Sequence, residues 1–329
     1  MSGPSQTLAP GPSRGHLDER RGIAYGFTAY VLWGLFPLYF AGLAPASAGE
    51  IVAHRIFWSF VLCLVVLAIR RELGEIRTLL SRSRLLAGIT VAAVLIAVNW
   101  GLYVVAVVSG NVTEAALGYF LNPVVTVALG VVVLRERLRL GQWIAVGIGV
   151  VAAVYLSFSA GTVPWIALAL AVTFALYGLS KKRLGATLPA LHGFAVETVV
   201  LTPVAIGLIL WLASTGRQTF TTSGPVHLAL LVLSGVVTAV PLLLFAASAR
   251  RVPLVTVGLL QFVTPVMQLL CGVVVLGETM SPARWVGFGI VWLALGVLSV
   301  DSVLRARSTR ARVPGREREE DSKIVEVRS

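Results

Sequence analysis

Long apolar runs separated by short polar segments dominate the chain. A transmembrane helix needs about 20 mostly apolar residues. Ten stretches meet this requirement, at 22–42, 50–69, 85–108, 114–134, 141–159, 163–180, 189–213, 227–249, 253–276 and 283–301. The pattern therefore predicts an all-α polytopic membrane protein with ten transmembrane helices.

Composition supports this prediction. Of the 329 residues, 57% are hydrophobic and 13% are charged, and the mean hydropathy is +0.87. Soluble domains carry roughly a quarter charged residues, so composition excludes an ordinary soluble protein. Residues 1–21 are rich in Pro, Ser and Gly, and residues 302–329 mix Arg and Glu densely. We expect both segments to be disordered cytoplasmic tails.

The net charge of +12 reflects the distribution of basic residues around the predicted helices. If the N-terminus is cytoplasmic, all but three of the 27 Lys and Arg fall on the cytoplasmic side; the exceptions are Arg55, Arg217 and Arg284. This is the positive-inside bias of membrane proteins. It predicts a multi-pass protein of the bacterial cell membrane with both termini in the cytoplasm, and no nucleic-acid partner.

The sequence also repeats itself. Shifting the chain by 142 residues lays 117–148 on 259–290 without a gap. The matched pairs include Pro123 with Pro265, Gly130 with Gly272, Glu136 with Glu278 and Trp143 with Trp285. Apolar helices can match by composition, but proline, glycine, glutamate and tryptophan in one register indicate a true repeat.

The repeat unit has five predicted helices, at 22–160 and 161–301. Because a unit with an odd number of helices ends on the opposite side of the membrane, its second copy crosses the membrane in the opposite orientation. The segment "RERLR" follows the fourth helix, whereas "GETMS", without a basic residue, follows the ninth. We therefore predict an inverted five-plus-five repeat around a site near the membrane midplane. Pro123 and Pro265 should loosen the fourth and ninth helices near that site.

Several motifs carry a family resemblance: "AYVLWGLFPLYF", "HRIFWSF", "NWGLYVVAV", "EAALGYFLNPVV" and "LQFVTPV". They resemble the drug/metabolite transporter superfamily, EamA type, and within it the RarD subgroup. The resemblance runs from about residue 22 to residue 301 and leaves out only the tails. It implies a bacterial inner-membrane permease without a cofactor, in a subgroup often named for chloramphenicol resistance but with a poorly defined substrate.

Polar residues at membrane depth are the candidates for a binding or coupling site, because ionisable groups there are costly and usually functional. Several share helix faces and should point into the protein or a wet cavity. The candidates are His54, Arg55, Asn99, Tyr103, Glu114, Tyr119, Asn122, Glu197, Gln261 and Gln268. An aromatic cavity wall, as an alternative to ordinary packing, is expected from Tyr30, Trp33, Tyr39, Trp100, Tyr119 and Tyr177.

Arg55 lies roughly 8 Å below the outer end of its helix at the α-helical rise. Glu114 starts the fourth helix on the same outer side, and Asn99 and His54 reach a similar level. We predict that Arg55 pairs with Glu114 and forms an outer polar gate or an anion-attracting pocket. The alternatives are an ion pair that only fixes helix packing, or an arginine that extends outward to the interface.

Glu197 lies roughly 12 Å above the inner end of its helix. The repeat aligns it with Arg55, but the inversion places the two at mirrored depths, so we expect no pair between them. With no obvious partner, a buried carboxyl favours its neutral form, which suits proton coupling. The alternative is a neutral acid bonded to a carbonyl or to Tyr177. For His54 we prefer a structural hydrogen bond over titration.

These features predict a secondary transporter that exports a small metabolite or drug by alternating access. The sequence has no nucleotide-binding loop of the G-x-x-x-x-G-K-[ST] kind, so a proton gradient or exchange must supply the energy. The alternatives are a channel or an integral membrane enzyme with a lipid-soluble substrate. The three Asp and four His are scattered without metal-ligand spacing. Besides the substrate, the expected partners are the lipid bilayer and protons, with the chain a monomer or weak dimer.

Overall fold

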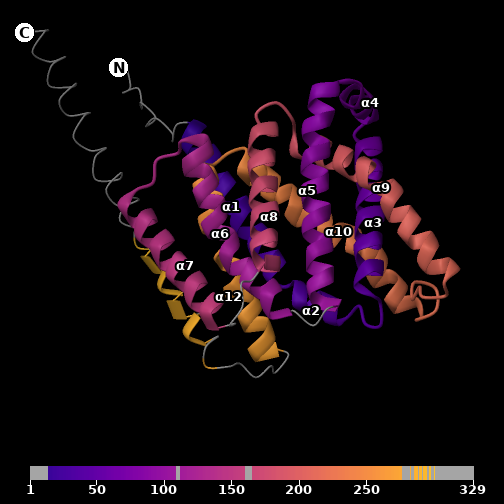
Figure 1. Cartoon of the computed structure of the whole chain (residues 1–329). Helices are drawn as coiled ribbons and strands as arrows, with labels where there is room; N and C mark the ends of the chain where they lie inside the picture. The colour runs from indigo at the N-terminus through magenta and orange to yellow at the C-terminus, as the bar shows by residue number, and fades with distance from the viewer. Residues whose placement is uncertain are drawn as a thin grey trace, which may run out of the picture.

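The computed structural model describes residues 14–108, 112–159 and 165–275, together with short pieces between 282 and 300 (Figure 1). Within these residues the fold is entirely helical. The helices are α1 (Arg14–Gly34), α2 (Phe36–Ala41), α3 (Ala48–Ile69), α4 (Leu73–Ser81), α5 (Ser83–Val108), α6 (Val112–Leu134), α7 (Leu140–Ser159), α8 (Trp165–Leu184), α9 (Ala190–Ser214), α10 (Pro225–Ala249), α11 (Leu254–Leu260), α12 (Val263–Leu269) and the π-helical η1 (Leu270–Val275).

Among the described residues, six helical segments are long and apolar enough to cross a membrane: Leu17–Ala41, Ala48–Ile69, Ser83–Tyr103, Trp165–Leu184, Ala190–Ser214 and Pro225–Ala249. Large apolar side chains lie on the outside of the bundle, such as Val132 and Val204, which are 76% and 71% exposed. Such a surface suits contact with lipid. The predicted tenth span lies mostly outside the described residues, so the count of ten stays a prediction.

Two local features differ from the sequence-based expectation. The first helix begins at Arg14, so part of the expected tail 1–21 is helical, in keeping with the helix-forming Leu, Glu and Arg of "HLDERR". The loop expected after the second span contains a short helix, α4. Its side chains Ile76 and Leu79 are buried, and α4 packs against α5 and α9. Leu73, Ile76, Leu79 and Leu80 recur at helical spacing, but this segment is short and carries charges, so a search for long apolar runs passes over it.

Pro123 and Pro265 have different effects on the helices that contain them. The ninth predicted span is broken, since α11 ends at Leu260 and α12 begins at Val263. Pro265 has no N–H, so the carbonyl four residues earlier, at Gln261, loses its helical donor. That carbonyl instead accepts from the N–H of Thr264 at 3.1 Å. By contrast, α6 continues through Pro123, so the expected loosening is observed in the second case and not in the first.

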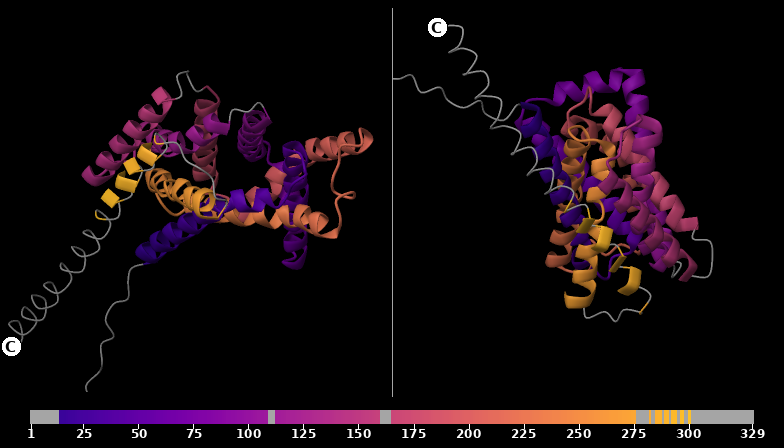
Figure 2. Two further views of the ribbon diagram at one scale, coloured as in Figure 1. Left: turned by 90° about the horizontal axis from the view of Figure 1, so that it is seen from below. Right: turned by 90° about the vertical axis from the view of Figure 1, so that its left-hand side faces the viewer.

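The helices of the two repeats interleave (Figures 1 and 2). Helix α8 lies between α5 and α6, and α3 contacts both α9 and α10. The 142-residue offset relates α1 to α8, α3 to α9, α5 to α10 and α6 to α11–α12. If each helix is replaced by its repeat equivalent, the contact between α5 and α8 corresponds to a contact between α10 and α1. The contact between α6 and α8 likewise corresponds to one between α12 and α1. The structure contains all four contacts. The helix pairing therefore has the two-fold symmetry of the repeat.

Glu136 joins the end of α6 to the beginning of α11. Its two carboxylate oxygens accept from the backbone N–H groups of Leu254 and Val255, each at 2.8 Å. These N–H groups begin a helix and have no partner within it. A Cβ on Gly130 would lie 3.0 Å from the Glu136 carboxylate and from Val255. The Glu136 carboxylate and the small Gly130 together allow the end of α6 to lie close to the beginning of α11.

Helices α3 and α10 pack with their backbones close together. A Cβ on Gly235 would lie 2.6 Å from the carbonyl oxygen of Trp58, so only glycine fits there. The hydroxyl of Ser59 donates to the carbonyl of Gly235 at 3.1 Å. This close contact fixes how α3, which carries Arg55, lies against α10.

Candidate functional site

A cavity of about 110 Å³ lies between helices of both repeats. One water molecule needs roughly 10–15 Å³ of such space, so the cavity has room for a small organic molecule. Six candidates from the sequence line it: Arg55, Asn99, Tyr103, Tyr119, Asn122 and Gln261. The other lining residues are Tyr30, Trp33, Phe36, Phe40, Val52, Ile96, Trp100, Phe174, Leu242 and Thr264.

Arg55 is buried, with 8% of its surface exposed. Its Nε donates to the hydroxyl of Thr238 on α10 at 2.8 Å. The guanidinium carbon lies 4.8 Å from the ring centroid of Trp100 and 5.4 Å and 5.5 Å from those of Phe36 and Phe40. Such cation–π contacts stabilise the charge without neutralising it. In the part of the chain that the structure describes, no carboxylate pairs with Arg55.

Three polar atoms in the cavity wall make no hydrogen bond of normal geometry to a described residue, although two of them, on Tyr30 and Gln261, belong to neighbouring side chains. They are the hydroxyl of Tyr30, Oδ1 of Asn122 and Nε2 of Gln261, in residues that are 2%, 7% and 4% exposed. Buried polar atoms without a partner are rare and need an explanation. Here all three atoms belong to residues that line one cavity, so a polar molecule or water bound in the cavity would supply the missing hydrogen bonds.

The break between α11 and α12 places Gln261 at the cavity. Its Oε1 accepts from the hydroxyl of Thr126 on α6 at 3.3 Å, which leaves Nε2 unpartnered. Next to it, the hydroxyl of Thr264 donates to the carbonyl of Tyr30 at 3.0 Å. A discontinuous helix that offers polar groups near the middle of the protein is a frequent feature of substrate sites in transporters.

Asn99 has a different role in the cavity wall. Its side-chain amide donates to the carbonyl of Leu170 at 2.9 Å and to the hydroxyl of Thr173 at 3.0 Å. These bonds join α5 to α8, which belong to different repeats. Asn99 is therefore a structural anchor as well as a lining residue.

Aromatic side chains form much of the remaining wall. Trp33 lies 5.7 Å from Phe174 and 5.4 Å from Tyr30 between ring centroids, and Tyr103 lies 6.2 Å from Tyr119. Of the aromatic residues singled out in the sequence, Tyr30, Trp33, Trp100 and Tyr119 line the cavity, whereas Tyr39 and Tyr177 do not. Phe36, Phe40 and Phe174 were not anticipated, because a phenylalanine in an apolar helix carries no distinguishing signal.

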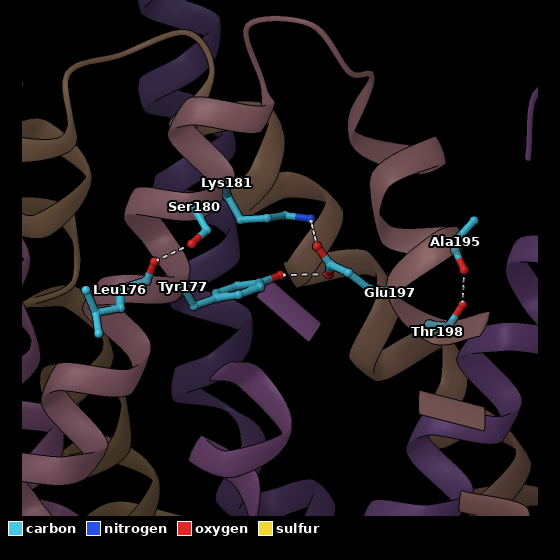
Figure 3. A network of polar contacts seen from close by, with 7 residues as sticks. All are labelled: Leu176, Tyr177, Ser180, Lys181, Ala195, Glu197 and Thr198. Atoms are coloured by element: carbon cyan, nitrogen blue, oxygen red, sulfur yellow. Dashed lines mark hydrogen bonds and ion pairs between the residues drawn. The ribbon is translucent and has the colours of Figure 1, made fainter. Parts of the chain in front are cut away.

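Glu197 lies apart from this cavity and has partners (Figure 3). Its carboxylate accepts from Lys181 Nζ at 2.7 Å and from the Tyr177 hydroxyl at 3.3 Å, both on α8. The expectation of a lone acid was therefore wrong, whereas the bond to Tyr177 that the alternative named is present. Lys181 is the first basic residue of "KKR" and was assigned to the cytoplasmic end, but it is only 5% exposed, because its side chain reaches inward toward α9. As expected, Glu197 does not pair with Arg55.

His54 also faces away from the cavity. Its Nδ1 accepts from the Trp58 indole N–H at 3.2 Å, and its ring stacks on Phe220 at 4.5 Å between centroids. Nearby, Glu50 accepts from the backbone N–H groups of Thr219 and Phe220 at 2.6 and 3.0 Å. These contacts hold the loop between α9 and α10 against α3. They favour the structural interpretation of His54.

Two further candidates lie only partly within the described structure. Glu114 belongs to α6 and Gln268 to α12, but their side chains are outside the described residues. The pair of Arg55 with Glu114 therefore stays a prediction.

Comparison with known proteins decides the family. Residues 20–158 and residues 162–300 each match the EamA-like transporter family. The chain belongs to the EamA-like transporter family. Its two matching segments begin 142 residues apart, the offset of the sequence repeat. The chain is therefore a multi-pass membrane transporter.

Individual relatives agree with this assignment. The chain is 49% identical to "Protein RarD" of Streptomyces exfoliatus, over 90% of this chain and 93% of that protein. It is 39% identical to "Uncharacterized transporter YojE" of Bacillus subtilis, over 90% and 99%. A crystal structure described only as that of a protein superposes with a TM-score of 0.64 at 18% identity, covering 85% of this chain and 96% of the other. That similarity concerns the fold alone.

Proposed function

We propose that this chain is a secondary active transporter that binds a small molecule in the cavity between its two repeats. The observation that supports this proposal most directly is that three unpartnered polar atoms, on Tyr30, Asn122 and Gln261, line one cavity beside Arg55. Without a ligand these groups could bond only to water in the cavity, and a polar atom left without any partner would cost free energy. A substrate that completes them and then leaves would explain why they persist.

Alternating access follows from the symmetry of the fold. The cavity is lined by helices from both repeats, 22–160 and 161–301, whose pairing is two-fold symmetric. In our proposal the repeats are inverted across ten spans, with both termini and both tails in the cytoplasm of a bacterial cell. Two repeats of opposite orientation can exchange conformations and expose one central site to each side in turn.

We assign the direction as export and the driving force as a proton gradient. The proposed coupling group is Glu197, whose bond to Lys181 would break when the carboxylate takes up a proton. The titratable groups that face it are Lys181 and Tyr177 of α8, and Cys63 of α3 lies close by. A buried ion pair that can be neutralised by one proton is a suitable element for coupling in a membrane protein.

Exchange in proteoliposomes tests the proposed site. Vesicles containing the purified chain are loaded with unlabelled compound, and uptake of the same labelled compound is followed across a panel of amino acids, small organic anions and amphenicols. The variants Asn122→Leu and Gln261→Leu remove the unpartnered groups. Gln218→Leu is the matched control, because Gln218 lies in the loop after α9 and its side chain bonds only to the Thr221 hydroxyl among the described residues.

The expected result is saturable exchange by the wild type and by Gln218→Leu. Each cavity variant should lose about tenfold in apparent affinity, since an unpaired hydrogen-bonding group in a buried site weakens binding by that order. Exchange by both cavity variants with wild-type affinity would contradict the proposed site.

A further inference from the structure

The charge of Arg55 is the strongest unexplained feature of the cavity. Within the described residues its only side-chain hydrogen bond is from Nε to Thr238. Three aromatic rings surround the guanidinium and remove it from water without supplying negative charge. A buried charge is costly unless it is paired, and no described residue supplies a negative charge to Arg55, so an anion bound in the cavity would balance it.

The hydrogen-bond donors that remain on the Arg55 guanidinium indicate which kind of anion fits. Because Nε is already used, the two terminal nitrogens Nη1 and Nη2 are the donors that remain, and neither bonds to a described residue. An arginine that offers two parallel N–H groups matches a planar carboxylate in a bidentate arrangement. A carboxylate thus fits the free end of Arg55 better than a single-atom anion does.

The other lining residues that the structure describes disfavour a positive group on the ligand. No Asp or Glu is among the lining residues that the structure describes, so an ammonium group would meet Arg55 without an acid to balance it. The wall is instead aromatic, with Trp33, Trp100 and Phe174, which favours a flat ring. The unpartnered atoms of Tyr30, Asn122 and Gln261 can bond a hydroxyl or carbonyl of the same ligand.

We propose that the cavity selects a small flat organic carboxylate with net negative charge and a further hydrogen-bonding group, held by Arg55 Nη1 and Nη2. This inference rests on the proposed function and assigns its substrate class. It predicts discrimination against neutral and cationic molecules of the same shape.

Titration calorimetry on the purified full chain in nanodiscs tests the selection. The probes are benzoate, 4-hydroxybenzoate and indole-3-carboxylate, each beside its amide, with tyramine as a cationic probe. Charge-assisted hydrogen bonds are about twice as strong as neutral ones. At least one carboxylate should therefore bind about tenfold more tightly than its amide, and tyramine should not bind.

Variants assign the preference to Arg55. Arg55→Gln should abolish the difference between carboxylate and amide, and Arg55→Lys should keep part of it. The control Arg217→Gln removes an arginine that is exposed and stacked on Trp211, and it should behave as the wild type. If Arg55→Gln does not fold, the carboxylate and amide affinities of the wild type and of Arg55→Lys still decide the question.

The same probes in exchange assays separate the two proposals. Exchange of neutral amphenicols or amides, with no carboxylate binding in calorimetry, would overturn the carboxylate inference and leave the transporter intact. Carboxylate binding that depends on Arg55, with no exchange of any compound, would support the inference and contradict the transport function. Equal affinity for amides and carboxylates, or no binding by any carboxylate, overturns the inference.

Discussion

Arg55 of α3 and Thr238 of α10 are joined by a 2.8 Å hydrogen bond from the guanidinium Nε to the threonine hydroxyl. Both residues are buried, and Thr238 is 1% exposed. The bond orients the guanidinium plane, and neither terminal nitrogen bonds to a described residue.

Removing this hydroxyl should weaken ligand binding as well as folding. In Thr238→Val the shape is kept, but a charged donor loses its partner, at a cost of about 1–3 kcal/mol. We expect the affinity for 4-hydroxybenzoate to fall about tenfold, as measured by calorimetry. Thr238→Ser, which keeps the hydroxyl, should bind as the wild type does, and equal affinity in Thr238→Val would show that Thr238 does not position Arg55.

The pair of Lys181 and Glu197 should behave as one unit in stability. Removing one partner of a buried ion pair leaves an uncompensated charge and costs about 3–5 kcal/mol. Glu197→Gln and Lys181→Met should each lower the thermal unfolding midpoint in detergent, and the double variant should recover most of the loss. Losses that simply add in the double-mutant cycle would mean that the two side chains do not interact.

Proton coupling can be tested on that stable double variant. In inside-out vesicles with an acidic interior, a transported substrate should collapse the pH gradient for the wild type. The double variant Glu197→Gln/Lys181→Met should still exchange substrate but leave the gradient intact, because no group remains at this position to carry the proton. If its gradient collapses like that of the wild type, the coupling group lies elsewhere.

The close approach of α3 and α10 predicts a steric effect. Gly235→Ala would place a methyl group 2.6 Å from the backbone oxygen of Trp58, so the helices must separate. We expect destabilisation of about 1–3 kcal/mol and weaker ligand binding, since α3 carries Arg55. Gly207→Ala in α9 is the matched control, because its Cβ would meet nothing within 4 Å. Equal unfolding midpoints for the two variants would contradict this account of the packing.

The sequence predicted the helical architecture and part of the site for clear physical reasons. Spanning helices need long apolar runs, and a polar residue inside such a run is conspicuous. Arg55, Asn99, Asn122 and Gln261 were found in this way, and all line one cavity. The repeat, read from Pro123, Gly130 and Glu136, predicted two related halves, and the two family matches begin at the same offset of 142 residues.

Other features left no readable signal in the sequence. Lys181 lies beside two more basic residues, so its charge resembled an ordinary cytoplasmic end; only the packing of α8 on α9 shows that it reaches Glu197. Phe36 and Phe40 surround Arg55, yet apolar residues in apolar helices are interchangeable until the fold places them. Thr238 likewise depends on the contact between distant helices.

The central claim is that one cavity, lined by both repeats, holds the substrate and opens to each side in turn. Thiol labelling of Asn122→Cys, in a chain with Cys63→Ala and Cys271→Ala, tests it directly. The account predicts that a membrane-impermeant maleimide reaches this cysteine from either side in separate experiments, and that 4-hydroxybenzoate slows the reaction from both sides. Gly207→Cys, outside the cavity, should show no such protection. Labelling of Asn122→Cys from one side only, or at a rate that no probe alters, would contradict the account.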